Sequence, residues 1–353
     1  MPYTSWTIQT LERLPHVTQV HHVLPDGTAW GTHKRAVVFF DGAEWRRTVD
    51  FPFVAPRDFF GFCRLAARPT RADKCNLYVN AAGNLLGIRG GSVYRIPPGS
   101  PPQPLFSIQG DCVLHGGLGE DDQGWTYFGE YFRNPGRGPV RLWKVSPDLT
   151  EWELAHEFPA GAIRHIHGIY PDPFDPGALW CTTGDYANEC YFFRSHDRFA
   201  TMDRFGDGTQ MWRAVRLYFT PEHVCWLTDS HIDQNFACRM ERSSASFERG
   251  DPVDCSVWYG ATTVEGVHVA FTTVEKGPAI KRKESSILVS EDAFHWEEIG
   301  AYRKDHWRPY RLFKYGVLSC PAGHVSLENF PISGEGLRGL DGVSEILQIR
   351  KSG

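Results

Sequence analysis

The feature that most constrains this chain is a short pattern that recurs at a regular interval. Each clear copy ends an apolar run with a serine and has an aspartate two residues later. The copies are KVSPDLTEWEL (144–154), FRSHDRFATMD (193–203) and LVSEDAFHWEEI (288–299), with aspartates Asp148, Asp197 and Asp292. The first gap is 49 residues and the second is 95, close to two periods. A weaker copy at 240–250 fills the missing place, and a further copy lies at 38–48. Such a period indicates a chain built from repeated structural units.

A second pattern gives the number of units. Apolar runs that end in a short polar tip occur at 29–33, 85–89, 127–131, 181–185, 226–230, 270–275 and 324–329. From Thr32 to Glu328 there are six intervals over 296 residues, or about 49 residues each, close to the length of a four-stranded propeller blade. The sequence therefore predicts an all-β fold, a seven-bladed β-propeller in a single domain over residues 1–353, with six blades as the alternative.

The serine–aspartate pattern resembles the Asp-box of the sialidase-type (BNR repeat) β-propellers, roughly Ser-x-Asp-x-Gly-x-x-Trp. The match is partial, because Leu149 and Ala293 stand near the glycine position. The resemblance implies that each copy marks a hairpin between the two outer strands of a blade. The last blade has only three strands of its own, so the N-terminal SWTIQTLERL is expected to complete it. Closing the ring in this way removes exposed sheet edges.

Composition excludes several classes of function. The net charge is −5 and no basic run is present, so a nucleic-acid partner is not expected. No apolar stretch approaches the roughly 18 residues of a membrane span. Nine cysteines are scattered without a CxxC pair, and no signal peptide is visible. These features predict reduced thiols and a cytoplasmic location.

The segment IRHIHGIYPDPFDPGALWCTTGD (163–185) points to a site. In a propeller, the innermost strand of a blade starts on the rim where the second strand ends. His165 and His167 begin one such strand and share a face, and Asp185 ends its neighbour. The same rule brings histidines, arginines and carboxylates of other blades to this rim, which predicts a functional site there.

Three functions are compatible with that rim. The first is a sialidase-like glycoside hydrolase acting on an acidic saccharide, since such enzymes need two positioned carboxyl groups. Its acid and its nucleophile or base would be two of Glu130, Asp185 and Asp229. Arginine binds a carboxylate through two parallel N–H donors, and aromatic rings stack on sugar rings. The substrate-binding residues would therefore be Arg164, Arg213, Tyr259, Arg308 and Arg311.

The second function is a polysaccharide (uronate) lyase or another metal-assisted enzyme. Its metal ligands or catalytic base would be His115, His165, His167 and His231, and imidazole ligands suit a divalent transition metal such as Mn, Fe, Zn or Ni. Tyr131 or Tyr259 would act as the acid. The third function is a non-catalytic propeller that binds a glycan or a protein. In the first two, the partner is an acidic oligo- or polysaccharide.

Overall fold

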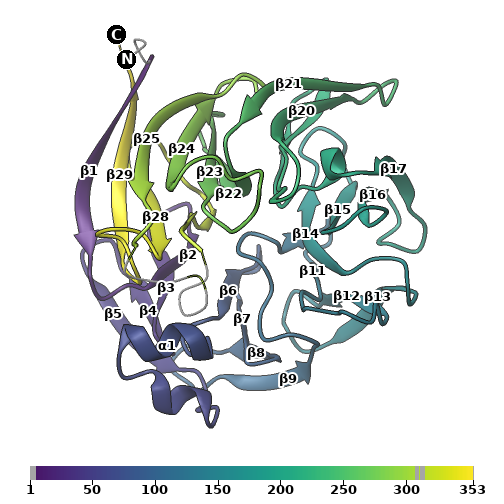
Figure 1. Cartoon of the computed structure of the whole chain (residues 1–353). Helices are drawn as coiled ribbons and strands as arrows, with labels where there is room; N and C mark the ends of the chain where they lie inside the picture. The colour runs from purple at the N-terminus through teal and green to yellow at the C-terminus, as the bar shows by residue number, and fades with distance from the viewer. Residues whose placement is uncertain (1–4, 307–309, 311–314, 353) are drawn as a thin grey trace.

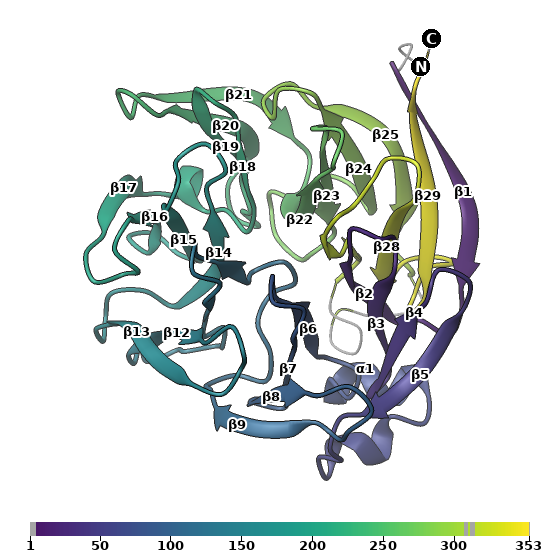
Figure 2. The same ribbon diagram turned by 180° about the vertical axis from the view of Figure 1, so that it is seen from behind.

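Seven antiparallel blades are arranged in a ring in the computed structural model of the chain (Figure 1). The structure describes residues 5–306, 310 and 315–352. This arrangement confirms the predicted seven-bladed β-propeller. The view from behind shows the same ring (Figure 2). No helix in the described part of the chain is long and apolar enough to cross a membrane.

Each of the first three blades has four strands in chain order from the axis outward, and the sheet of the first blade has the short β27 (Ala322–Gly323) as an additional strand beside its innermost one. The first contains β2 (Gln19–Val23), β3 (Ala29–His33), β4 (Ala36–Phe40) and β5 (Trp45–Asp50). The second contains β6 (Asn76–Val79), β7 (Leu85–Arg89), β8 (Ser92–Ile96) and β9 (Gln103–Ser107). The third contains β10 (Gly119–Glu120), β11 (Thr126–Gly129), β12 (Val140–Val145) and β13 (Trp152–Phe158).

The next three blades repeat this order. The fourth contains β14 (His165–Pro171), β15 (Leu179–Gly184), β16 (Cys190–Ser195) and β17 (Asp203–Gly208). The fifth follows the short 3-10 helix η2 (Gln210–Trp212) and contains β18 (Leu217–Phe219), β19 (His223–Leu227), β20 (Asn235–Glu241) and β21 (Phe247–Val253). The sixth contains β22 (Ser256–Thr262), β23 (His268–Thr273), β24 (Glu284–Ser290) and β25 (Glu297–Arg303).

The seventh blade joins the two ends of the chain. It contains β26 (Val317–Ser319), β28 (Phe330–Glu335), β29 (Ser344–Lys351) and, outermost, β1 (Trp6–Leu14). β1 runs antiparallel to β29, from Trp6 opposite Lys351 to Leu14 opposite Ser344. β1 and β29 lie side by side in both views (Figures 1 and 2). The predicted closure by the N-terminal strand is therefore confirmed.

The recurring serine–aspartate pattern forms the expected hairpins between the third and fourth strands. In the fourth blade, Asp197 accepts hydrogen bonds from the Thr201 backbone N–H (2.8 Å) and from the Ser195 hydroxyl (2.9 Å). Leu149 and Ala293, which directly follow the aspartate and stand next to the glycine position of the motif, have left-handed φ angles of 56° and 60°. The turn keeps its shape without glycine, so the hydrogen bonds to the aspartate offset the unfavourable backbone conformation.

Two parts of the fold differ from the expectations. The strand end predicted at 324–329 is wrong, because the second strand of the last blade begins only at Phe330 and ends at Glu335. The preceding residues form a loop, after β27 (Ala322–Gly323) pairs in parallel with β2 of the first blade. In addition, η1 (Arg57–Phe60) and the helix α1 (Arg64–Thr70) are inserted between the first two blades.

Apolar side chains fill the space between neighbouring blades. Between the fourth and fifth blades, Trp180, Phe192 and Trp226 are fully buried, and the rings of Phe192 and Trp226 are 4.8 Å apart at 85°. Such edge-to-face contacts stabilise the fold beyond the contribution of the buried apolar area. All nine cysteines are free, and only Cys63 is exposed.

Candidate metal centre

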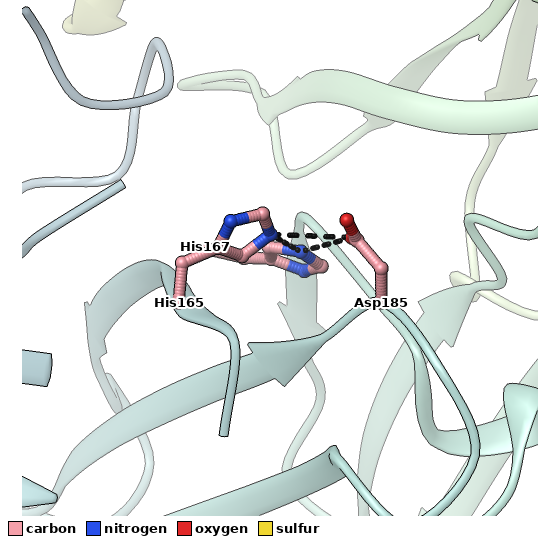
Figure 3. Close-up of side chains that lie close together, drawn as sticks. All are labelled: His165, His167 and Asp185. Carbon is pink, nitrogen blue, oxygen red and sulfur yellow. Dashed lines mark hydrogen bonds and ion pairs between the residues drawn. The ribbon is translucent and has the colours of Figure 1, made fainter. Parts of the chain in front are cut away.

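The two histidines and the aspartate of segment 163–185 meet at one end of the fourth blade (Figure 3). His165 Nε2, His167 Nε2 and Asp185 Oδ1 lie 3.2 Å from one another in all three pairs. We refer to these residues as the His–His–Asp triad. A Cβ atom at Gly184 would lie 2.9 Å from His167 Cε1, so glycine leaves room for the ring. The triad residues are buried, with 2–8% of each exposed.

Backbone carbonyls of adjacent blades fix the orientation of both imidazoles. His165 Nδ1 lies 2.9 Å from the carbonyl oxygen of Phe132, and His167 Nδ1 lies 2.9 Å from that of Ala214. A carbonyl oxygen only accepts hydrogen bonds, so each Nδ1 carries a proton, and in the neutral imidazole Nε2 then presents a lone pair. Two lone pairs and a carboxylate oxygen therefore face one another, and a bound cation or an added proton is needed to relieve their repulsion.

The spacing of the triad suits a transition metal. Ligand atoms about 2.1 Å from a metal are about 3.4 Å apart in a tetrahedron and about 3.0 Å apart in an octahedron. The observed 3.2 Å lies between these values. Two histidines and one carboxylate on one face are also the ligand set of non-haem iron sites. Among the described residues, this is the one group of three or more side chains with metal-ligand spacing.

Two arginines surround the carboxylate of the triad. Arg164 Nη1 lies 2.6 Å from Asp185 Oδ2, and Arg213 Nη2 lies 3.1 Å from Asp185 Oδ1. Burial opposes ionisation of Asp185, but the charge of Arg213 lowers its pKa well below the usual value. Asp185 is therefore ionised at neutral pH, as a metal ligand must be.

A second carboxyl group lies on the other side of Arg213. Asp229 Oδ2 is 3.1 Å from Arg213 Nη2, whereas the buried Oδ1 has no hydrogen-bond partner among the described residues. Burial, together with the charge of Glu275, raises the pKa of Asp229 to about 7. Burial also raises the pKa of Glu275, which Arg213 opposes. Asp229 can thus gain or lose a proton near neutral pH.

Tyr131 and His231 complete the surroundings. The ring of Tyr131 lies over His165, with centroids 4.2 Å apart. Burial and the carboxylates of Asp185 and Asp229 raise the pKa of the Tyr131 phenol, so it keeps its proton. His231 Nδ1 lies 3.2 Å from Arg213 Nη1. Burial and the charge of Arg213 lower the pKa of His231, which favours the neutral ring.

Several predicted site residues lie elsewhere. Glu130 is fully buried, and its carboxylate accepts hydrogen bonds from the backbone N–H groups of Gln109 (2.9 Å) and Arg141 (3.2 Å). His115 and Tyr259 contact each other, with ring centroids 5.5 Å apart, and line a cavity at the opposite end of the ring. A catalytic, substrate-binding or ligand role for these three residues stays a prediction, without support from this geometry.

The two remaining arginines cannot be placed. Arg308 and Arg311, predicted to hold a substrate carboxylate, lie outside the described residues. Conversely, sequence reasoning missed Gln210, whose amide donates to the Asp185 backbone oxygen (2.9 Å) and whose Oε1 accepts from Ser230 (2.8 Å). Gln210 lies in η2, before the inner strand of the fifth blade, so the expected strand ends gave no signal for it.

Comparisons with known proteins support the fold and no closer family. No protein-family model matches the chain, and no curated protein matches it. A streptogramin B lyase structure has a TM-score of 0.59 at 11% identity, with 98% of both chains covered. A chain of the mitotic checkpoint complex has a TM-score of 0.59 at 8% identity, covering 98% of this chain and 96% of that one. YCF48 bound to D1 peptide has a TM-score of 0.51 at 9% identity, covering 99% and 96%.

Proposed function

We propose that this propeller is a metal-dependent enzyme that acts on a carboxylate-bearing saccharide by elimination. The observation that carries the proposal is the His–His–Asp triad, with three ligand atoms 3.2 Å apart and both Nε2 lone pairs turned inward. A divalent transition metal held there would neutralise the substrate carboxylate and so acidify the proton on the adjacent carbon. His165, His167 and Asp185 would hold this metal.

The surrounding side chains fit the proton transfers of an elimination. Asp229, with a pKa of about 7, would take the proton next to the substrate carboxylate. The electron pair of that C–H bond forms the new double bond as the bond to the leaving oxygen breaks. Tyr131, which keeps its phenolic proton, would donate it to this oxygen. Solvent then carries the proton from Asp229 back to Tyr131.

The same geometry gives less support to glycoside hydrolysis. Asp185 Oδ1 and Asp229 Oδ2 each lie 3.1 Å from Arg213 Nη2, so they are at most about 6.2 Å apart. That distance is too short for an inverting glycosidase, whose carboxyl groups lie about 6.5–9.5 Å apart to leave room for a water molecule. The third predicted carboxylate, Glu130, is engaged by backbone N–H groups.

A binding function remains the second candidate because of the structural neighbours. One of them is described as bound to a peptide and another belongs to a protein assembly, whereas a third is a lyase. At 8–11% identity these likenesses extend to the fold alone. A propeller that only binds would show the triad occupied by metal but no turnover.

The test is a substrate screen on protein loaded in turn with Mn²⁺, Fe²⁺, Zn²⁺ and Ni²⁺. Polygalacturonate and alginate serve as uronate polymers, and a sialyl-oligosaccharide serves as an acidic substrate for hydrolysis. We expect an ultraviolet-absorbing unsaturated product that depends on the metal and is lost in His167→Ala. His196→Ala, at an exposed histidine paired with Asp175, is the matched control. Reducing ends without unsaturated product would contradict elimination, and metal binding without turnover would indicate a binding function.

A further inference from the structure

A large cavity opens at the end of the ring opposite the His–His–Asp triad. It has a volume of about 1290 Å³ and is bounded by the turns that join the first and second strands of several blades. Tyr170, Arg216 and His268 are among the residues that line it, and His115 and Tyr259 also contribute. No triad residue lines it. Cavities of this size accommodate small organic ligands.

Arg216 is the unusual group in this wall. It precedes β18 and is half-buried, and its guanidinium carbon lies 5.3 Å from the ring centroid of Tyr170 and 6.0 Å from that of Tyr218. Its buried Nε has no hydrogen-bond partner among the described residues. Within the described part of the chain, no carboxylate forms an ion pair with it. The ring faces attract the guanidinium, and its charge is available to pair with an incoming anion.

The groups around Arg216 do not compensate its charge. Burial, together with Arg216 itself, lowers the pKa of His268 to about 4, so this histidine is neutral. Burial raises the pKa of the Cys320 thiol to about 12 and raises that of the Tyr218 phenol, so both keep their protons. All three feel the charge of Arg216, and none of them carries a negative charge at neutral pH.

Among the described residues, five other Asp, Glu and Arg residues line the wall, and all but Glu222 are engaged by residues other than Arg216: Arg239, Glu120, Glu291 and Asp292. Arg239 lies 2.6 Å from Glu248 and stacks on Phe294 at 4.2 Å. The Glu120 carboxylate accepts hydrogen bonds from the Tyr78 hydroxyl (2.8 Å) and from the Ala81 backbone N–H (2.9 Å). Arg216 thus differs from the other arginine of the wall in having no acidic partner.

The two tyrosines beside Arg216 are held in place by adjacent blades. The Tyr218 hydroxyl donates to the Val269 carbonyl at 3.0 Å, and the Tyr170 hydroxyl donates to the Val215 carbonyl. A Cβ at Gly260 would lie 2.1 Å from the Tyr218 hydroxyl oxygen, so a glycine is needed there. The rings are therefore fixed, and the guanidinium between them is preorganised.

We propose that this cavity binds a small organic anion, with Arg216 forming charge-assisted hydrogen bonds to its carboxylate or phosphate and the body of the ligand lying against the tyrosine rings. Arginine pairs with both kinds of anion through two parallel N–H donors. This site is separate from the proposed metal centre, because it lies at the other end of the ring and shares no residue with the triad.

The test compares charged and neutral probes by isothermal titration calorimetry. Benzoate and phenyl phosphate carry the two candidate anions on an aromatic ring, and benzyl alcohol is the neutral probe of similar shape. At least one of the two anions should bind the unmodified protein about tenfold more tightly, or better, than benzyl alcohol does. Which anion binds more tightly identifies the carboxylate or the phosphate as the preferred group.

Variants then assign the binding to Arg216. Arg216→Met should weaken anion binding by about tenfold or more, and Arg216→Lys should recover part of it. Arg239→Met, at the paired arginine of the same wall, should bind the anions like the unmodified protein. The proposal is wrong if neither anion binds at up to about 10 mM, if benzyl alcohol binds equally well, or if Arg239→Met has the larger effect. This result is independent of metal binding at the His–His–Asp triad, because no triad residue lines the cavity.

Discussion

Replacing Arg213 by methionine should destabilise the propeller strongly. Arg213 is 4% exposed, and its guanidinium contacts the carboxylates of Asp185 and Asp229. It also donates to the Asp185 backbone oxygen at 3.2 Å. Methionine keeps much of the apolar stem but leaves two buried carboxyl groups without their shared cation.

The expected cost follows from that burial. Removing one partner of a buried ion pair costs about 3–5 kcal/mol. The unfolding entropy of a chain of 353 residues is about 0.7 kcal/mol per kelvin, so Tm should fall by about 4–7 °C. Differential scanning calorimetry at pH 7.5, about half a unit above the pKa of Asp229, measures this shift with Asp229 largely ionised.

Two further variants show whether the reasoning holds. Arg141→Met removes an ion pair with Glu157 whose side chains are 40% and 39% exposed, and it should cost at most about 1 kcal/mol. Arg213→Met/Asp229→Asn should be more stable than Arg213→Met, because loss of Arg213 raises the pKa of Asp229 further, and the folded chain must then hold a proton that the unfolded chain releases. A loss below about 1 kcal/mol in Arg213→Met, or no recovery in the double variant, would refute the proposed role of Arg213.

Three other predictions concern the pH dependence of stability, the Ser-x-Asp turn of the fourth blade and the closure of the ring by β1. Asp229 holds its proton in the folded chain at pH values where the unfolded chain has lost it, so its contribution to stability is lost as pH rises from about 4 to about 7. Chemical denaturation at several pH values should show that the free energy of unfolding falls less steeply with pH in this range for Asp229→Asn than for the unmodified chain. An unchanged slope would contradict the raised pKa of Asp229. Ser195→Ala leaves the buried Phe199 N–H without its 2.8 Å acceptor and should cost about 1–3 kcal/mol in the same assay; no loss would mean that the turn does not need this bond. Deleting residues 1–14 uncovers the edge of β29 and should give aggregated protein on size-exclusion chromatography, whereas a stable monomer would contradict closure by β1.

The architecture was predictable because its signals are local. The Ser-x-Asp turns and the regular tips depend on residues close together in sequence, and they gave the blade count without any long-range information. The N-terminal strand was assigned by counting, since one blade lacked a strand. The prediction failed at 324–329, where a polar segment after an apolar one is a loop that leads to Phe330 rather than a strand end.

The candidate site was predictable only in part. His165, His167 and Asp185 were found because they lie at the ends of two adjacent strands of one blade. The hydrogen bonds that turn the imidazoles come from Phe132 and Ala214 on neighbouring blades, and a sequence pattern does not reveal such partners. Glu130 occupies an equivalent strand end, but backbone N–H groups engage its carboxylate.

The position of a side chain along the propeller axis could not be predicted from the sequence either. His115 was expected beside the other histidines, yet its ring lies near His21 and Tyr259, with both centroid distances 5.5 Å. The loop before β10 determines this position, and its path depends on contacts with other blades. A rule based on strand ends therefore gives the blade and the face of a residue, but not its distance from the rim.

The measurement that tests the central claim most directly is the metal content of the purified protein by elemental mass spectrometry. The protein is first dialysed against Mn²⁺, Fe²⁺, Zn²⁺ or Ni²⁺ and then against metal-free buffer. The His–His–Asp triad predicts about one equivalent of one of these metals in the unmodified chain and in His196→Ala, and none in His167→Ala. Metal-free protein after every dialysis, or equal metal content in His167→Ala, would contradict the assignment of the triad as a metal centre.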